Sequence, residues 1–558
     1  MFRKFILSIL GIAALMVSCA KEKEVGSTEL KEQSPEAPFL WESANLYFLL
    51  TDRFHNGDPS NDQNFDRNLP TGPMRGFQGG DIKGITQKIQ EGYFTDLGVN
   101  AIWFTPVVEQ VHGGTDEGTG FTYAFHGYWT KDWTALDPNF GTMEELAELV
   151  ATAHQHGIRV LLDAVINHTG PVTEQDPQWP DAWVRTSPKC AFNSYETAVT
   201  CTLVDNLPDI RTESEEEVAL PEELVAKWKA EGRYEKEMQE LDAFFARTGY
   251  PRAPKYYIIK WLTDYVRMFG IDGFRADTVR HIEEDVWADF KKECELAFAE
   301  WKRAYPDQVL DGNGFYMVGE VYGYEVISSG KFFDFGDLKV NYYDHGFDSM
   351  INFEFKKSAN ADYESLFSSY AATVNAVDSG IQVLNYATSH DDSEPFDKER
   401  NRTLETGTKL LLTPGTAQIY YGDETGRGLV IEGTQGDATL RSPMNWAEIS
   451  GDTLTQGILA HWQKLGRFRR DHPSVGAGSH AMMSAQPYIF KRSFTNGDYS
   501  DQVIVGLDLA PGEKVVETGE VFADGTVLRD AYSGQEATVA EGKVKFNTPF
   551  GIVLLEAL

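Results

Sequence analysis

The chain has 558 residues, with 50 basic against 85 acidic side chains and a formal net charge of -35. This balance argues against a polyanion partner such as nucleic acid, because phosphate binding needs a basic face. Hydrophobic residues make up 42% of the chain and aromatic residues 13%, which is enough for a packed core and excludes wholesale disorder. The length allows about three or four domains of ordinary size, or fewer if one is a large barrel.

Residues 1–18 are typical of a secretory signal peptide. Arg3 and Lys4 precede an apolar run over residues 5–17, which is too short for a stable membrane span and leads into small residues. The run ends in Leu-Met-Val-Ser-Cys19, which resembles a bacterial lipobox, so Cys19 is predicted to be the lipidated first residue of the mature chain. The alternative is an ordinary cleaved signal with an incidental cysteine.

Residues 19–39 are charged, small and proline-bearing, as in a solvated tether. No later stretch of the sequence reaches the roughly 18 apolar residues of a membrane helix. We therefore predict an exported protein that is lipid-anchored in the cell envelope, at the outer membrane or cell surface, or that is periplasmic. Its contact with a membrane would be through Cys19 alone.

Short β-like runs alternate with helical patterns from about residue 44 onward. Eight strands with helices between them predict an α/β fold, a (β/α)8 TIM barrel, whose active site lies where the strands run out into loops. The predicted strands are 45–50, 100–104, 159–163, 273–276, 316–320, 349–353, 383–388 and 418–421.

Two segments depart from a plain barrel. Some 85 residues separate the third strand from the helix before the fourth, which is too long for a connecting loop and predicts an inserted subdomain. After about residue 470 the pattern becomes alternating strands and turns, as in a C-terminal all-β sandwich domain. The expected boundaries are 40–168 and 255–470 for the barrel, 169–254 for the insertion and 471–558 for the β domain.

Three cysteines remain beyond Cys19. Cys190 and Cys201 lie 11 residues apart in a loop-like segment and are able to form a disulfide outside the cytoplasm. Cys294 lies in a helical pattern and is predicted to be a buried thiol. Neither spacing suggests zinc.

Acids and histidines fall at the C-terminal ends of the predicted strands. Asp163 and His168 follow the third strand, Asp277 the fourth and Glu320 the fifth, while His390 and Asp391 follow the seventh. Acids at this rim of a barrel converge on one pocket, and a buried acid is costly unless it is paired, bound to metal or used in chemistry. Hydrolysis of a glycosidic bond needs two such carboxyls, one as proton donor and one that attacks the anomeric carbon or activates water.

Short motifs around these residues resemble the α-amylase family, glycoside hydrolase family 13, and in particular its bacterial lipoprotein α-amylase-like and neopullulanase-like members. The four signature regions are matched in order by Asp163-Ala-Val-Ile-Asn-His168, Gly273-Phe-Arg-Ala-Asp-Thr-Val-Arg-His281, Gly319-Glu-Val321 and Ser389-His-Asp391. Supporting stretches are His126-Gly-Tyr-Trp129, Leu207-Pro-Asp-Ile210, Tyr420-Tyr-Gly-Asp-Glu424 and Arg441-Ser-Pro-Met-Asn-Trp446. The resemblance covers roughly residues 40–450.

The resemblance implies three catalytic residues. Asp277 would be the nucleophile that forms a covalent glycosyl-enzyme, and Glu320 the general acid and then the base that activates water. Asp391 would grip sugar hydroxyls and favour the distorted, oxocarbenium-like ring. The alternative for all three is structural ion pairing on an inactive scaffold.

The resemblance also implies a set of substrate-binding residues. Arg275 would keep Asp277 ionised through a charge-assisted hydrogen bond, and Tyr128 would be a stacking platform beneath the sugar. Arg280 stands where many relatives carry Lys, at a position that lines the leaving-group side. The set is His126, Tyr128, His168, Arg275, Arg280, His281 and His390.

Two calcium sites are expected. The first is an oxygen-rich cluster that resembles a calcium loop of cyclodextrin-forming and neopullulanase-like enzymes; its alternative is a set of plain turn formers. It consists of Asn56, Asp58, Asn61, Asp62, Gly79 and Asp81. The second, implied by the family resemblance, would use Asn167, Asp209 and the backbone carbonyl of His281, and would pin the insertion to the barrel.

The expected function is retaining, endo-acting hydrolysis of α-1,4-glucosidic bonds in starch, maltodextrins or related α-glucans. One alternative is a glucanotransferase or a cyclodextrin or pullulan hydrolase, which uses the same covalent intermediate. An alternative of another class is a non-catalytic glucan-binding lipoprotein. Its signature would be loss of Asp277 or Glu320, and both are present.

Overall fold

A computed structural model describes residues 37–376 and 379–558. The predicted signal peptide, Cys19 and the tether up to residue 36 lie outside the described residues. Within the described ranges, no helix is both long enough and apolar enough to cross a membrane.

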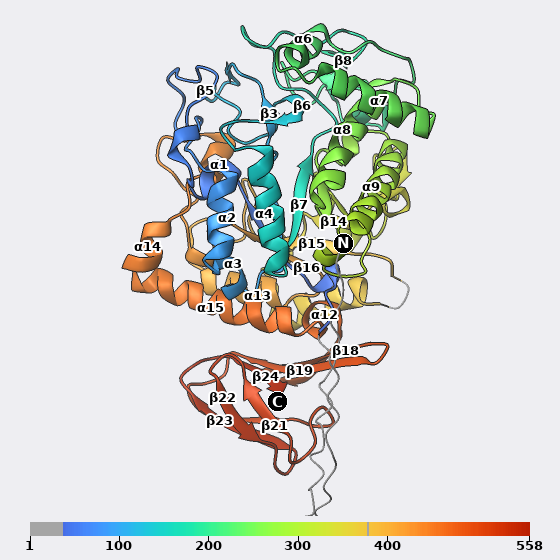
Figure 1. Ribbon diagram of the computed structural model, residues 1–558. Helices are drawn as coiled ribbons and strands as arrows, with labels where there is room; N and C mark the ends of the chain where they lie inside the picture. The colour runs from blue at the N-terminus through green and yellow to red at the C-terminus, as the bar shows by residue number, and fades with distance from the viewer. Residues whose placement is uncertain (1–36, 377–378) are drawn as a thin grey trace, which may run out of the picture. The chain divides into compact units, whose positions relative to one another are not determined.

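Eight parallel strands close into a barrel, which confirms the predicted fold (Figure 1). Each predicted strand is present, with its ends within two residues of the expected ones. The strands in barrel order are β1 (Asn45–Leu49), β16 (Thr416–Tyr420), β15 (Val383–Tyr386), β14 (Ser349–Asn352), β11 (Tyr316–Gly319), β10 (Gly273–Ala276), β7 (Arg159–Ala164) and β2 (Ala101–Phe104). They are buried along their whole length, as expected of parallel strands covered by helices.

Helices between the strands cover the barrel (Figure 1). Helix α4 (Met143–Gln155) begins with a capping box between Thr142 and Glu145. Helix α8 (Pro254–Phe269) starts with its proline in the first turn and ends at Gly270. A Cβ on Gly270 would lie 2.0 Å from the Trp301 ring, so this helix end needs glycine. The other helices of this part are α1 (Thr51–Phe54), α2 (Ile82–Gln90), α3 (Tyr93–Asp96), α9 (Glu284–Ala304), α10 (Val326–Ser329), α11 (Phe355–Ser358), α12 (Tyr363–Val374), α13 (Thr403–Leu412), α14 (Trp446–Gly451) and α15 (Thr453–Asp471).

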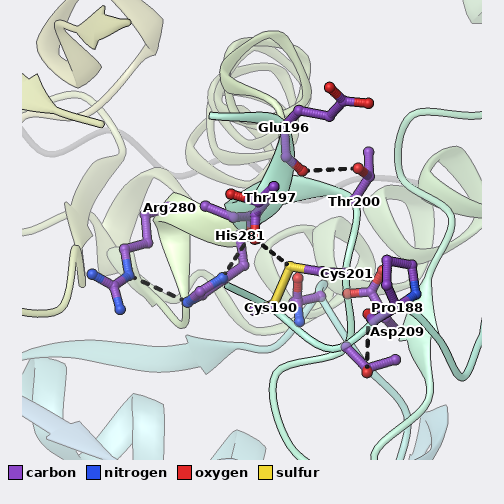
Figure 2. Close-up of a disulfide and its surroundings, with 12 residues drawn as sticks. Pro188, Cys190, Glu196, Thr197, Thr200, Cys201, Asp209, Arg280 and His281 are labelled. Carbon is purple, nitrogen blue, oxygen red and sulfur yellow. Dashed lines mark hydrogen bonds between the residues drawn. A yellow bond between two sulfur atoms is a disulfide. The ribbon is translucent and has the colours of Figure 1, made fainter. Parts of the chain in front are cut away.

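The segment between β7 and α8 has its own short elements. These are β8 (Val184–Arg185), α5 (Glu196–Val199), β9 (Asp209–Ile210), α6 (Glu222–Ala230) and α7 (Tyr234–Thr248). Cys190 and Cys201 form a disulfide here, which closes the loop that contains α5 (Figure 2). Cys294 is a buried free cysteine, as predicted.

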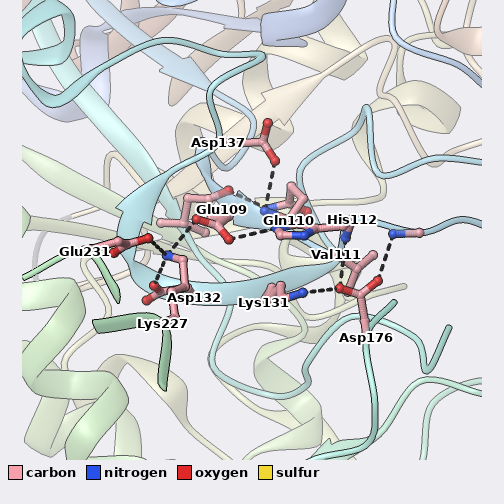
Figure 3. Close-up of polar contacts among 12 residues, drawn as sticks. Glu109, Gln110, Val111, His112, Lys131, Asp132, Asp137, Asp176, Lys227 and Glu231 are labelled. Carbon is pink, nitrogen blue, oxygen red and sulfur yellow. Dashed lines mark hydrogen bonds and ion pairs between the residues drawn. The ribbon is translucent and has the colours of Figure 1, made fainter. Parts of the chain in front are cut away.

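An ion-pair network joins this segment to a ribbon after the second barrel strand (Figure 3). The ribbon consists of β3 (Val108–Gln110) and β6 (Thr130–Leu136). Lys227 of α6 lies 2.7 Å from Glu109 and 2.5 Å from Asp132 of the ribbon. Asp132 also pairs with Arg233 at 3.0 Å. Because Asp132 is fully buried, losing these cations would leave an uncompensated charge, so the network anchors the inserted helices.

The remaining strands lie in ribbons and in a C-terminal β region. Four of them form two-stranded ribbons, β4 (Thr115–Asp116) with β5 (Phe121–Thr122), and β12 (Phe333–Asp334) with β13 (Lys339–Val340). After α16 (Ser474–Ala477) come a six-stranded antiparallel sheet and a two-stranded sheet, with a hydrophobic core of their own. Their strands are β17 (Ser479–Ala485), β18 (Tyr488–Asn496), β19 (Tyr499–Leu507), β20 (Gly512–Glu517), β21 (Val527–Asp530), β22 (Gln535–Thr538), β23 (Lys543–Thr548) and β24 (Val553–Ala557).

His472 connects the last barrel helix to this β region. Its Nδ1 lies 2.8 Å from Asp501 of β19, and its Nε2 lies 2.5 Å from Glu556 of β24. Burial lowers the pKa of His472, but the two carboxylates overcome this and raise it to about 9. Both acids are held below their ordinary pKa by the same contacts, against the effect of burial. The imidazolium therefore stabilises the junction.

We predict that His472 makes the stability of the protein depend on pH. Because its folded pKa is about 9 and an unfolded histidine titrates near 6.5, the stabilisation is complete below about pH 6.5 and is lost as the pH rises to 9. The shift corresponds to a contribution on the order of 3 kcal/mol. Urea unfolding of the wild type should show the free energy of unfolding decreasing over this pH range, and His472→Gln should make the decrease smaller. His345→Gln is the matched control, and an unchanged slope in His472→Gln would contradict the assignment.

Candidate active site

The ends of three neighbouring barrel strands bring three carboxylates around one guanidinium. The register of β7 and β10 places Asp163 opposite Arg275. Arg275 Nη1 donates to Asp163 Oδ1 at 2.8 Å and to Asp277 Oδ1 at 2.7 Å, while Nη2 lies 2.9 Å from Glu320 Oε1. The Arg275 side chain is 0% exposed. One buried cation therefore holds the three acids close together.

The local backbone after β10 also orients Glu320. Thr278 adopts a left-handed conformation, with a φ of 48°, directly after Asp277. Its N–H donates to Glu320 Oε2 at 3.2 Å. A non-glycine residue in this region is strained, and such strain persists where the surrounding structure holds it.

Burial raises the pKa of all three of these acids. Burial raises the pKa of Glu320, and the charges of Asp277 and Asp391 raise it further against the opposing effect of Arg275. Burial also raises the pKa of Asp277, while Arg275 opposes the shift through both charge and hydrogen bonding. The pKa of Asp163 is raised to about 7 by burial. A carboxyl with a raised pKa can carry a proton near neutral pH, as a general acid must.

Asp391 forms its ion pair with Arg441, whereas the other three acids pair with Arg275. Arg441 Nη2 donates to Asp391 Oδ1 at 2.5 Å, and its Nη1 lies 2.5 Å from Asp437. His390 Nε2 lies 2.9 Å from Asp391. Burial alone would raise the pKa of Asp391, but His390 and Arg441 reverse the effect and hold it below its ordinary value.

Aromatic and imidazole rings form one wall of the site. Tyr128 donates its hydroxyl to Asp163 Oδ2 at 2.8 Å, and its ring stacks near His390 and His126. Burial lowers the pKa of His126 to about 3 and that of His168 to about 4. These imidazoles are therefore neutral at physiological pH, and each can donate or accept hydrogen bonds without adding charge.

Arg280 and Tyr322 lie at another part of the rim. Arg280 Nη1 donates to the carbonyl oxygen of Tyr322 at 3.0 Å, and its Nε donates to His281 Nε2 at 3.3 Å. His281 Nδ1 in turn donates to the carbonyl oxygen of Ala198 at 2.8 Å. Tyr322 is 48% exposed and Phe192 is 47% exposed, so both present aromatic faces of the kind that sugar rings stack on.

A cavity of about 420 Å³ joins these groups. Eight of the ten predicted catalytic and substrate-binding residues line it, while Arg275 and His390 support it through Asp277 and Asp391. The eight are His126, Tyr128, His168, Asp277, Arg280, His281, Glu320 and Asp391. The structure therefore brings the predicted substrate site together.

Several lining residues were not in the predicted set. Glu117 lies between β4 and β5 and Asp437 lies in a short 3-10 helix (Gly436–Leu440), and neither segment carries a recognisable signal in the sequence. Arg441 opens the Arg-Ser-Pro-Met-Asn-Trp stretch, and Tyr322 lies two residues after Glu320, so both were within reach of motif reasoning. Asp163 was noticed as a strand-end acid, but its contact with Arg275 depends on the strand register.

The first predicted calcium loop keeps oxygen atoms without protein partners. The side-chain oxygens of Asn56 and Asn61 are buried and accept no hydrogen bond from the part of the chain that the structure describes. A Cβ on Gly79 would lie 2.7 Å from Asp62 Oδ1, so only glycine fits beside these side chains. Buried, unpartnered amide oxygens beside a carboxylate are suitable ligands for a hard cation.

Two other predicted ligands of this loop make protein contacts. Asp81 caps α2, and its carboxylate accepts from the backbone N–H groups of Gly57, Asp58 and Gly84. Asp58 accepts from Ser60 and pairs with Lys83 at 3.0 Å. Asp81 therefore shapes the loop. The Asp58 carboxylate is already paired with Ser60 and Lys83, so it is not a free ligand.

The second predicted calcium site also has unpartnered oxygens. Among the described residues, Asn167 Oδ1 and Asp209 Oδ1 are buried without a partner, while Asp209 Oδ2 pairs with Arg185 Nε at 2.9 Å. Burial raises the pKa of Asp209 to about 9, although Arg185 lies 2.9 Å away and opposes the shift. These oxygens also fit a divalent cation, which would keep Asp209 ionised.

The nearby sulfur atoms do not belong to a metal site. The sulfurs of Cys190 and Cys201 and a ring nitrogen of His281 all lie within 4.8 Å of one another. Both sulfurs are oxidised in the disulfide, and a metal would need thiolates. The cluster is therefore a packing contact of the disulfide against His281.

Comparison with known families decides the classification. The family described as "Alpha amylase, catalytic domain" matches residues 48–459, which include all the cavity residues named above. The chain belongs to the α-amylase family. It is accordingly a glycoside hydrolase, and the predicted recognition is confirmed.

Relatives within the α-amylase family include hydrolases and transferases. The periplasmic α-amylase of Escherichia coli strain K12 is 36% identical over 86% of this chain and 74% of its own length. The cyclomaltodextrin glucanotransferase of Thermoanaerobacterium thermosulfurigenes is 24% identical over 90% of this chain, which spans 65% of that relative. The crystal structure of an Anoxybacillus α-amylase has 22% identity and a TM-score of 0.65, over 93% of this chain and 99% of that one, and supports the fold.

We predict that Arg275→Gln destabilises this α-amylase family member by about 3–5 kcal/mol near pH 7, because three buried acids lose their shared cation. The loss in free energy of unfolding should be smaller at pH 5, because protonation neutralises the uncompensated carboxylates. Urea unfolding at both pH values measures it.

Arg280→Gln is the matched control for this prediction, because Arg280 lines the same cavity and makes no ion pair within the described residues. A deficit in Arg275→Gln no larger than that of the control, or one independent of pH, would contradict the shared-cation account.

Proposed function

We propose that this α-amylase family enzyme is a retaining, endo-acting hydrolase of α-1,4-glucosidic bonds in starch-like glucans. The observation that carries the proposal is the placement of Asp277 and Glu320 on the two terminal nitrogens of the Arg275 guanidinium. Two carboxyls held close together on one cation suit a mechanism in which one attacks and the other donates a proton.

In the proposed first step, Asp277 attacks the anomeric carbon and the glycosidic bond breaks. Glu320 gives its proton to the departing oxygen, so the leaving glucan is released as a neutral alcohol. Arg275 supports the ionised form of Asp277. Glu320 then removes a proton from water, which attacks the intermediate and restores Asp277.

The remaining cavity residues hold the reacting sugar. Asp391 is kept ionised by Arg441 and His390, so it can accept hydrogen bonds from sugar hydroxyls. Tyr128 offers a ring beneath the site, and the neutral imidazoles of His126 and His168 can bind hydroxyls. Arg280 and His281 would contact the sugar on the leaving-group side.

A glucanotransferase is the second candidate, in which a sugar hydroxyl replaces water in the second step. The exposed rings of Phe192 and Tyr322 at the Arg280 end of the cavity favour binding of such an acceptor. Products from starch, maltoheptaose, pullulan and cyclodextrins separate the two reactions, because transfer yields chains longer than the substrate. A non-catalytic glucan binder would release no product.

We predict that Asp277→Asn and Glu320→Gln each lower starch hydrolysis by several orders of magnitude while the fold and glucan binding persist, since both amides keep the shape of the acids. Released reducing ends, melting temperature and glucan affinity are the measurements. The wild-type product should first appear as the α-anomer. Substantial residual activity in either variant, or a β-anomer, would contradict the assigned roles.

We further propose that calcium binds at the two predicted sites. Asn56, Asn61 and Asp62, with the Gly79 backbone, would hold one ion, and Asn167, Asp209 and the His281 carbonyl the other. The support is a set of four buried side-chain oxygens that have no partner among the described residues: Asn56 Oδ1, Asn61 Oδ1, Asn167 Oδ1 and Asp209 Oδ1. Bound calcium would supply positive charge that holds loop segments to the barrel.

We predict that chelation lowers the melting temperature and that added calcium restores it. At a free calcium concentration of about 100 times Kd, one site would contribute about 2.7 kcal/mol. Asp209→Asn should reduce the response, since it removes the only formal charge among the ligands of that site. Asp205→Asn is the matched control, because that side chain is 90% exposed. A melting temperature insensitive to both chelator and calcium would refute the metal sites.

The cellular location is also proposed. The E. coli relative described as periplasmic, together with the signal-like residues 1–18, supports export. Lipid anchoring at Cys19 would then hold the enzyme in the cell envelope, and the mass of the mature N-terminus would test it. The substrate is an uncharged polymer, so the acidic surface would not hinder its approach.

A further inference from the structure

The disulfide Cys190–Cys201 closes a loop beside His281 and Arg280 (Figure 2), two residues that line the candidate active site. Its base is also held by backbone hydrogen bonds, from Cys190 N to the carbonyl of Thr202 at 3.0 Å and from Thr202 N to the carbonyl of Pro188 at 2.8 Å. Leu203, two residues after Cys201, lines the catalytic cavity. Only Thr202 therefore stands between the disulfide and a cavity-lining residue in the chain.

Residues inside this loop contact the part of the cavity wall formed by Arg280 and His281. The carbonyl oxygen of Ala198 accepts from His281 Nδ1 at 2.8 Å. The Phe192 ring meets the His281 ring edge-on, with centroids 5.6 Å apart, and the Arg280 guanidinium lies 4.9 Å from the Phe192 centroid. The disulfide sulfurs lie within 4.8 Å of a His281 ring nitrogen.

The loop therefore sets both the tautomer of His281 and the position of Phe192. With Nδ1 bonded to Ala198, His281 Nε2 carries a lone pair that accepts from Arg280. Phe192 is 47% exposed, and its ring packs against His281 and Arg280. Its place over Arg280 depends on the path of the loop backbone.

This wall belongs to the leaving-group end of the cavity. Glu320, the proposed proton donor, is followed two residues later by Tyr322, whose carbonyl accepts from Arg280. Asp391 instead connects to Arg441 and Asp437, which also line the cavity. A sugar that departs with the proton of Glu320 would pass beside Arg280, Tyr322 and Phe192.

We propose that the Cys190–Cys201 disulfide is a positioning element for the leaving-group end of the site: it holds the 190–201 loop so that Phe192 and His281 bind the departing glucan segment. The inference rests on the proposed glucan hydrolysis. It assigns the disulfide a role in substrate specificity, in addition to stabilising the inserted segment.

Activities on two substrates distinguish this role in substrate binding from a general stabilisation of the protein. Maltoheptaose places sugars on both sides of the scissile bond, whereas α-maltosyl fluoride releases fluoride and has no sugar at the leaving-group end. For the double variant Cys190→Ser/Cys201→Ser, we expect kcat/KM on maltoheptaose to fall about tenfold, mainly through KM, as for the loss of one aromatic contact. Activity on α-maltosyl fluoride should stay within about twofold.

Further variants link the effect to the loop. Phe192→Ala in the oxidised protein should give the same split between substrates, and Phe332→Ala, another exposed phenylalanine, should not. Reductant should lower maltoheptaose turnover by the wild type and leave the double variant unchanged. If the double variant does not fold, Phe192→Ala and reductant treatment of the folded wild type decide the question.

Each outcome supports or overturns the inference. Equal losses on both substrates would mean that the disulfide acts on the whole site, and no loss on either would leave it a structural crosslink only; both results overturn the proposal. A wild type inactive on both substrates would overturn the proposed function, and the inference with it. An active wild type with unchanged variants would overturn the inference alone.

Discussion

The arrangement of the active site depends on the buried guanidinium of Arg275. It contacts Asp163, Asp277 and Glu320 from three adjacent strands, and without it these acids would be buried as uncompensated charges or would have to take up protons. The cost of such a cluster is offset because the cation is shared and hydrogen-bonded at fixed geometry. The barrel supplies that geometry, since parallel strands in register deliver their terminal side chains to one rim.

A second arginine, Arg441, pairs with the remaining acid of the site, Asp391. Asp391 lies outside the reach of the Arg275 ion pairs and is held by Arg441, which comes from a loop beyond the last barrel strand. The two cations thus produce unlike acids within one cavity, with Asp391 held below its ordinary pKa and Glu320 raised above it. A proton donor and an ionised hydroxyl-binding group can then coexist, although their side chains are chemically almost the same.

The eight strands and the strand-end acids could be predicted because each is a local pattern: a short buried run followed by a polar residue. The motifs around Asp277 and Glu320 then indicated the family, and the match over residues 48–459 confirmed it. The contact of Arg441 with Asp391 and those of Phe192 with His281 and Arg280 could not be predicted in this way. They join segments tens of residues apart, and no periodicity or turn signal records which loops meet above a barrel. For Asp81, the oxygen-rich pattern suggested a ligand, whereas its carboxylate caps a helix.

The sequence by itself determined the class of fold, the family and the identity of the acids at the strand ends, because strand burial and short motifs depend on neighbouring residues. Tertiary structure alone decided which charges pair, which oxygens remain without partners, and where the Cys190–Cys201 loop lies. These depend on distances between side chains far apart in the chain. Proton affinities follow from such distances and from burial, so the chemical difference between Glu320 and Asp391 exists only in the folded protein.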